Sequence, residues 1–207
     1  MKTFLRMALP LALLIAAPLQ AQTTLGVKGG ISLSQTDIED ADFGSRTGFL
    51  GGAFARFGLG SSLALQPELL YVQKGATESD ATLKLDYFEI PVLLQYRFAT
   101  PGSLTPVLYA GPYVAVETKC ELSGSDGGAT VSFACDSLEP LLGTDIDTKS
   151  LDFGAIVGGG LDFHLGSVIV GAEARYEFGF VDVNDTSDVS VTNGGWAILG
   201  SVGFPLM

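Results

Sequence analysis

The sequence predicts an all-β fold, an eight-stranded antiparallel up-and-down transmembrane β-barrel. Three observations predict it: aromatic residues at even spacings, a charge-free face between them, and connections that alternate between long and short. Four stretches begin with an aromatic residue and end with a phenylalanine eight or ten positions later: Phe49 to Phe57, Phe88 to Phe98, Phe153 to Phe163 and Trp196 to Phe204.

Even spacing puts both aromatic ends of each stretch on one face of a β-strand, because side chains alternate with period two. Every second residue between them is uncharged, as in Ile90, Val92, Leu94 and Tyr96. Tilted strands of this length cover roughly 20–25 Å, the height of the apolar band of an outer-membrane barrel between its two aromatic girdles. A soluble sandwich also alternates, but it has no reason to place aromatic residues at both ends of alternate strands.

Eight strands are expected, and the connections between them alternate in length. Connections 35–45, 75–82, 118–149 and 182–194 are long, whereas 58–61, 99–103 and 164–167 are tight. Long outer loops that alternate with short periplasmic turns are typical of these barrels. The strands are expected at about 24–34, 46–57, 62–74, 83–98, 104–117, 150–163, 168–181 and 195–206.

Residues 1–21 read as a secretory signal peptide, and residues 22–207 as the barrel domain. Lys2 and Arg6 precede a short apolar stretch, and Ala21 ends a plausible cleavage site. The apolar stretch is too short to span a bilayer, where about 20 residues are needed. The sequence therefore predicts an exported protein located in the outer membrane and in contact with its lipid.

The composition is 47% hydrophobic and 16% charged, with a net charge of −12. Removing Lys2 and Arg6 leaves 9 bases against 23 acids, a net charge of −14. Such acidity argues against nucleic acid as a partner, because phosphates require a basic surface.

Charged residues on the opposite face of the strands are expected to point into the barrel. Unpaired charges there would be costly, so they should pair with one another. One interpretation is a proton or ion path, and the other, which we favour, is a structural salt-bridge network in a barrel too narrow for a pore. The predicted members are Lys28, Arg56, Glu68, Glu89, Arg97, Asp162, Glu173, Arg175 and Glu177.

Cys120 and Cys135 are the sole cysteines, and both fall in the longest outer connection. An exported protein meets an oxidising compartment, so we expect them to form a disulfide that staples a β-hairpin above the barrel. The outer connections are also rich in Asp and Glu, but their spacing matches no calcium loop, and a solvated acidic surface is the favoured interpretation.

No catalytic constellation stands out, so the sequence predicts a protein that is not an enzyme and needs no cofactor or metal. His164 is the single histidine and is expected in a tight periplasmic turn. No Ser or Asp arrangement can be built around it. The run Gly158 to Gly160 lies inside a strand rather than before a helix, so it is no phosphate loop.

Several strand motifs resemble one known family of barrels. The stretch from Tyr87 to Phe98 is similar to the PorT-type outer-membrane β-barrel proteins, as are 65–71, 110–113 and 173–176. The resemblance implies an eight-stranded barrel, and the founding member is implicated in secretion across the outer membrane. One departure is the chain end, Phe204-Pro205-Leu206-Met207, where many barrels finish on an aromatic residue.

The sequence thus predicts a monomeric, non-enzymatic barrel with a structural role or an interaction role through its acidic outer loops. One alternative is a PorT-like component of a protein-secretion apparatus, with other envelope or secretion proteins as partners. The second alternative is a lipid-modifying barrel enzyme.

Overall fold

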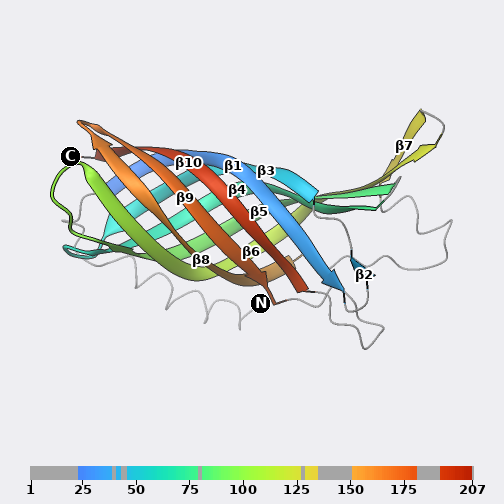
Figure 1. The fold of residues 1–207 in the computed structure, drawn as a ribbon, viewed down its shortest axis with the longest axis horizontal. Helices are drawn as coiled ribbons and strands as arrows, with labels where there is room; N and C mark the ends of the chain where they lie inside the picture. Colours follow the sequence, from blue (N-terminus) through green and yellow to red (C-terminus); the bar gives the residue numbers. More distant parts are fainter. Residues whose placement is uncertain are drawn as a thin grey trace, which may run out of the picture.

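In the computed structural model the chain forms a closed antiparallel β-barrel, which confirms the predicted fold class (Figure 1). The structure describes residues 23–38, 41–42, 46–78, 81–126, 129–134, 151–180 and 192–206. Two short strands, β2 (Ala41–Asp42) and β7 (Ala129–Ala134), pair with β1 and β6 outside the wall. The wall itself consists of β1 (Thr23–Ile38), β3 (Arg46–Gly58), β4 (Leu63–Glu78), β5 (Ala81–Arg97), β6 (Leu104–Asp126), β8 (Leu151–Leu165), β9 (Val168–Gly179) and β10 (Thr192–Leu206).

Each wall strand pairs with the next wall strand along the chain, and β10 closes the barrel on β1. The closing ladder is continuous from Thr23 opposite Leu206 to Asp37 opposite Thr192. Closure gives the backbone groups of every wall strand a partner on both sides, which a sheet in hydrocarbon requires because lipid offers no hydrogen bonds. Among the described residues, no helix is long and apolar enough to cross a membrane.

Burial alternates along the strands with period two, as β5 shows most simply. Glu89 and Leu93 are buried completely, whereas Ile90 and Leu94 are about half exposed. One face of each strand therefore lines the interior, and the other forms the outer surface of the barrel.

The two ends of the barrel differ in how their strands are connected. At one end, which we call the tight-turn end, residues 59–62, 98–103 and 166–167 link the strands. Gly166 has a φ of 66°, which favours glycine in the shortest of these turns. The first residue of β1 and the last of β10 also meet at this end. The opposite end, which carries the other connections, is called the long-loop end.

One connection expected to be long is largely strand. Residues 75–82 were predicted as an outer loop, but β4 and β5 remain paired from Gly75 opposite Lys84 to Glu78 opposite Ala81. Only residues 79–80 lie between the two strands. The hairpin continues beyond the aromatic girdle because its backbone hydrogen bonds do not depend on lipid.

The longest strand also runs past its predicted end at residue 117. A register irregularity between Asp86 and Tyr87 interrupts the pairing of β5 with β6, which then resumes and reaches Ala81 opposite Gly124. Beyond that point β6 turns back into β7, with Asp126 opposite Ala129. We call residues 75–78, 81–85, 119–126 and 129–134 the outer extension. Figure 1 shows its β6–β7 part projecting beyond the barrel.

The interior is narrow, and small residues let neighbouring strands coil tightly. A Cβ atom on Gly52 would lie 2.0 Å from the carbonyl oxygen of Leu69, and one on Gly111 would lie 2.0 Å from that of Val92. Glycine is therefore required at both inward positions. Glycine in a strand costs conformational entropy, but here it allows the wall to close with only eight strands, which offsets that cost.

Candidate functional site

The interior of the barrel holds the charged residues that could carry chemistry. All nine side chains predicted for the lumen point inward from six different wall strands or lie at its mouth. Seven of them are buried: Lys28, Arg56, Glu68, Glu89, Asp162, Arg175 and Glu177. The side chain of Glu173 is 9% exposed and that of Arg97 is 23% exposed.

The central group of charges links β1, β4 and β9. Lys28 Nζ donates to Glu68 Oε1 at 2.6 Å and to Glu173 Oε1 at 2.5 Å. Arg175 Nη1 donates to the other Glu68 oxygen at 3.1 Å. Both carboxylate oxygens of Glu68 are therefore occupied by cations from two different strands, which ties three parts of the wall together across the lumen.

The group nearer the long-loop end consists of two cations that share two carboxylates. Arg175 Nη2 lies 2.8 Å from Glu177 and 3.5 Å from Glu89. Lys74 Nζ lies 3.3 Å from Glu177 and 3.5 Å from Glu89. The Lys74 ammonium also lies 5.7 Å from the ring centre of Tyr87 and 5.2 Å from that of Tyr113, within cation–π range.

The group at the tight-turn end is richer in neutral polar side chains. Arg56 Nη1 donates to Asp162 Oδ2 at 2.7 Å, and Arg56 Nε donates to Gln66 Oε1 at 2.8 Å. Gln95 Nε2 donates to the same Gln66 oxygen at 3.0 Å. Arg97 Nη2 lies farther from Asp162, at 3.7 Å.

The single histidine is placed differently from the prediction. His164 was expected in the turn 164–167, but it lies within β8, and its Nε2 atom lies 3.3 Å from Arg97 Nη2 and 3.3 Å from Thr105 Oγ1. Even-numbered residues of β8 face inward, so the ring belongs to the tight-turn end of the interior. Continued pairing of β8 with β9 as far as Leu165 opposite Val168 accounts for the difference.

Buried apolar side chains form two clusters in the interior, one on β3, β4 and β10 and the other on β5, β6 and β8. One cluster contains Leu50, Leu70, Val72, Ala197 and Leu199, and the other is Tyr87, Leu93, Tyr109, Tyr113, Ala115 and Ile156. Within the described part of the chain, no group of three or more His, Cys, Asp or Glu residues could hold a metal ion. The arrangement is suited to holding strands together through paired charges.

Some interior polar residues were missed by the sequence reasoning. Lys74 and Asp152 were placed at or near predicted strand ends, although they share the parity of Glu68 and Asp162 on the same strands. Gln66 and Gln95 carry no charge and were left out of the predicted network. Gln66 links Arg56 to Glu68 of the central group, and Gln95 donates to Gln66. Strand parity alone would have found all four.

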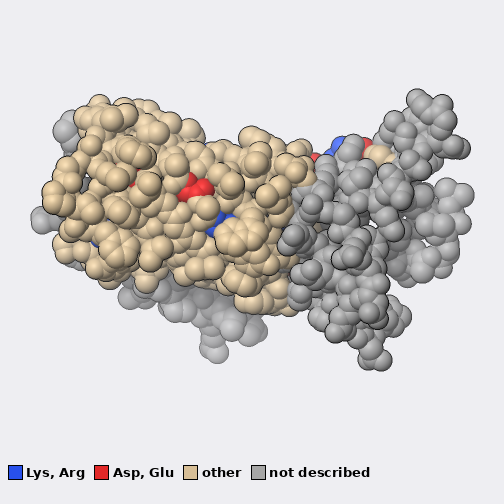
Figure 2. Space-filling view, in the orientation of Figure 1, with Lys and Arg blue, Asp and Glu red and all other residues tan. Residues whose placement is uncertain are grey.

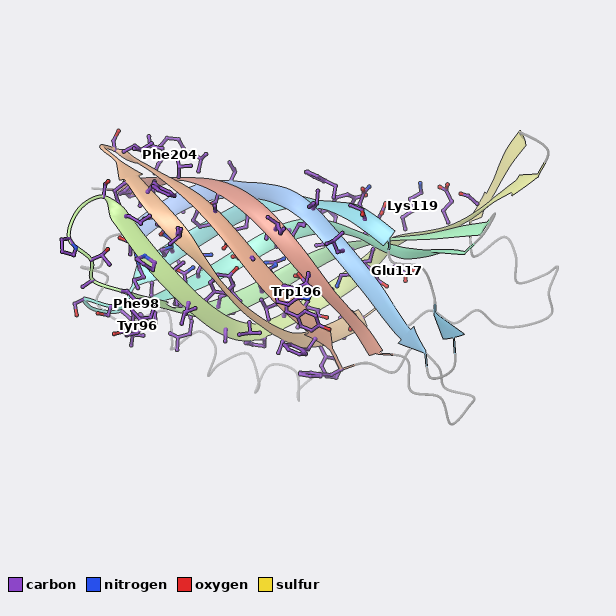
Figure 3. All side chains as sticks on the ribbon, in the orientation of Figure 1. Tyr96, Phe98, Glu117, Lys119, Trp196 and Phe204 are labelled. Carbon is purple, nitrogen blue, oxygen red and sulfur yellow. The ribbon has the colours of Figure 1, made fainter. Side chains whose placement is uncertain are left out.

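The outer surface of the wall carries the aromatic residues predicted for the girdles. Phe49, Phe88, Phe153 and Trp196 are about half exposed toward the long-loop end, and Phe98, Phe163 and Phe204 are 40–52% exposed at the tight-turn end, where Phe57 is less exposed. Figure 3 shows Tyr96, Phe98 and Phe204 at one end of the barrel and Trp196 toward the other. Tyrosines extend both rows, since Tyr96 packs against Phe98 and Tyr176 against Trp196.

The wall between these aromatic rows is apolar. Its exposed side chains include Val27, Leu69, Leu108 and Ile198, each more than half exposed. In Figure 2 the described part of the wall is tan apart from small red and blue areas. On β6, Glu117 lies next to the outer extension and Lys119 lies within it, past the apolar part of the wall (Figure 3). Glu121, 2.7 Å from Lys119 Nζ, raises the pKa of that ammonium by hydrogen bonding.

The predicted disulfide falls outside the described residues, as do Cys135 itself and the side chain of Cys120. The hairpin expected around it is present, because residues 121–126 of β6 pair with β7. The ladder ends with Glu121 opposite Ala134. Extending this register by one residue would put position 135 opposite position 120, so the disulfide stays a prediction consistent with the register.

Comparison with known proteins identifies the family. Residues 20–185 match the family described as outer membrane protein β-barrel domain. No curated protein sequence matches the chain. The crystal structure of Neisserial surface protein A is 16% identical with a TM-score of 0.53, covering 88% of this chain and 97% of that one.

Two further solved structures are more distant. OprG from Pseudomonas aeruginosa is 13% identical with a TM-score of 0.48, covering 90% of this chain and 97% of that one. The outer membrane enzyme PagL is 15% identical with a TM-score of 0.47, covering 85% of this chain and 97% of that one. The fold, the apolar wall and the family match agree, and the chain belongs to the outer membrane protein β-barrel domain family and is located in the outer membrane.

Proposed function

We propose that this protein is a monomeric, non-enzymatic outer-membrane barrel that acts through its outer extension, as an interaction surface for other envelope proteins. The observation that carries the proposal is the continuation of three strand ladders past the aromatic girdle. β4–β5, β5–β6 and β6–β7 remain paired in this region, so the extension is a sheet rather than a set of separate loops. Tight turns of such barrels face the periplasm, which orients the extension toward the cell exterior.

The interior of the barrel supports the same proposal, because its side chains argue against transport of a solute through the barrel. Arg175 and Glu89 are completely buried in the interior, and their charged partners come from β4, β5 and β9. Eight strands leave room only for side chains. A role at the surface therefore fits the molecule better than conduction through it.

A pull-down from native outer membranes tests the proposal. The wild-type protein is compared with a variant in which residues 121–134 are replaced by a two-residue turn, and with a control carrying a short insertion in turn 59–62. We expect the wild type and the control to retain the same envelope protein and the shortened variant to lose it. Equal retention by all three, or retention of nothing by the wild type, would contradict the proposal.

A PorT-like role in protein secretion is the second candidate, and the strand motifs at 87–98 and 65–71 support it. Stable co-purification with other components of a secretion apparatus would distinguish it from a self-contained surface protein. A lipid-modifying activity is the third candidate. It has less support, because His164 lies beside Arg97 and Thr105 at the tight-turn end and not at the outer end of the barrel. Mass spectrometry of lipid A from cells with and without the protein tests it, and an altered lipid A would replace the non-enzymatic proposal.

A further inference from the structure

The charges of the interior are distributed unevenly along the barrel axis. Among the described inward residues, the tight-turn end has two arginines, Arg56 and Arg97, against the single carboxylate of Asp162. Toward the other end, carboxylates outnumber cations: Lys28, Lys74 and Arg175 face Glu68, Glu89, Asp152, Glu173 and Glu177. The tight turns at 59–62, 98–103 and 166–167 contain no Asp or Glu. The mouth at this end is therefore locally basic in an acidic protein.

With one described carboxylate for two arginines at this end, Arg97 is the arginine without a close carboxylate partner. Asp162 Oδ2 lies 2.7 Å from Arg56 but 3.7 Å from Arg97. The Arg97 side chain is 23% exposed, whereas that of Arg175 is fully buried. Within the described residues, its polar side-chain contacts run through Nη2, to Asp162 and to His164. Nε and Nη1 make no side-chain contact within these residues, so their N–H groups can donate to the oxygens of an oxyanion.

Two further polar groups converge on the same place from other strands. Thr105 of β6 and His164 of β8 lie 3.3 Å apart, and His164 lies 3.3 Å from Arg97 of β5. The backbone N–H of Arg97 donates to the carbonyl of Ser62 at 2.7 Å, which holds the end of β5 against the first tight turn. A guanidinium, a hydroxyl and an imidazole thus lie on three adjoining strands with a fixed backbone.

The depth of Arg97 in the membrane indicates which oxyanion it meets. Its neighbours in the chain, Tyr96 and Phe98, are 47% and 40% exposed on the lipid face and pack on each other at 4.9 Å. Interfacial aromatic residues of this kind sit at the level of the lipid headgroups. Phosphate is the oxyanion of phospholipid headgroups, so it is the ligand chemistry available at this depth.

We propose that the tight-turn mouth of the barrel is a phosphate-binding site, in which the Arg97 guanidinium holds the phosphate oxygens and Thr105 and His164 add hydrogen bonds. The phosphate comes either from an inner-leaflet headgroup or from solution. The site is at the opposite end from the outer extension, so it stands or falls independently of the proposed surface role.

Titration of the refolded mature chain with inorganic phosphate tests the site. The protein is held in alkyl maltoside micelles, which contain no phosphate, at constant ionic strength, and binding is measured by calorimetry. We expect saturable binding that Arg97→Gln weakens about tenfold or more and Arg97→Lys weakens less, because lysine keeps the charge but loses the planar set of guanidinium donors. Lys119→Gln removes one cation at the other end and should bind like the wild type. Both Arg97 variants are checked for folding by heat-dependent gel mobility, and if the glutamine variant fails to fold, the lysine variant decides.

A bilayer comparison then distinguishes the two sources of phosphate. The titration is repeated in nanodiscs of phosphatidylglycerol and of a phosphate-free galactolipid. Binding that survives in galactolipid and disappears in phosphatidylglycerol assigns the site to a headgroup, whereas equal binding in both assigns it to free phosphate. No saturation in any medium, or equal affinity of the wild type and the folded Arg97 variants, would overturn the proposal.

Discussion

The two faces of the barrel wall are built from alternate residues of the same strands, yet they obey different rules. Side chains on the outer face, such as Ile90 and Leu94, need only be apolar, because they contact fluid lipid. The inner face needs particular partners at particular positions. Arg175 contacts carboxylates from three strands, through Glu68, Glu89 and Glu177. On the outer face, one apolar residue should therefore replace another with little loss of stability. On the inner face, most substitutions of the paired residues should destabilise the barrel.

The largest effect is expected from removing the most connected interior charge. Arg175→Met should destabilise the folded barrel by about 3–5 kcal/mol, because it leaves buried carboxylates without their shared cation. Equilibrium urea unfolding in lipid vesicles, followed by the fluorescence of the sole tryptophan, Trp196, measures the change. Ala174→Met, which changes the adjacent lipid-facing residue, is the matched control and should be near neutral. Similar losses in the two variants would mean that the faces do not differ.

A charge placed on the outer face should have the next largest effect. Val92 is 39% exposed on the lipid side, and its neighbour Leu93 is fully buried inside. Val92→Arg should cost about 2–4 kcal/mol at mid-membrane, whereas an arginine near a girdle should cost about 0–1. Conservative replacement by leucine at position 92 should be harmless. If polar residues were accepted equally well at positions 92 and 93, the assignment of the two faces would be wrong.

The smallest effect on the barrel is expected from the predicted disulfide. Replacing Cys120 and Cys135 by serine should loosen the β6–β7 hairpin and leave the stability of the barrel unchanged, because the closed ladder holds the wall together. The chain-entropy model assigns a loop of this size about 3 kcal/mol, and this acts on the hairpin alone. A membrane-impermeant thiol reagent should label intact cells after mild reduction. Labelling that requires a broken outer membrane would put the extension in the periplasm.

The features that alternation controls could be predicted from the sequence. Period-two patterning and even aromatic spacing are enough to predict the eight wall strands and the inward placement of residues such as Glu89 and Arg175. Strand ends could not be predicted, because outside the lipid the apolar pattern stops while backbone pairing continues. For that reason residues 75–82 were predicted as a loop, and His164 as part of a turn.

Pairing within the interior was equally out of reach, since it depends on contacts between distant strands. Lys28 reaches Glu173 across the closing seam of β10, and Arg56 reaches Asp162 across the lumen. No local spacing encodes such contacts. Composition could indicate that the charges pair, but not that Lys74 and Arg175 share the same two carboxylates.

The central claim is that the interior charges are energetically coupled to one another, whereas lipid-facing residues contribute independently to the free energy of unfolding. A double-mutant cycle of Glu68→Gln and Arg175→Met, whose side chains lie 3.1 Å apart, tests it most directly. The cycle is compared with one of Ile31→Ala and Ile198→Ala, which lie opposite each other on β1 and β10 and face the lipid. We predict a coupling energy of about 1–3 kcal/mol for the interior pair and below about 0.5 kcal/mol for the outer pair. Additive effects in the interior pair would contradict the account.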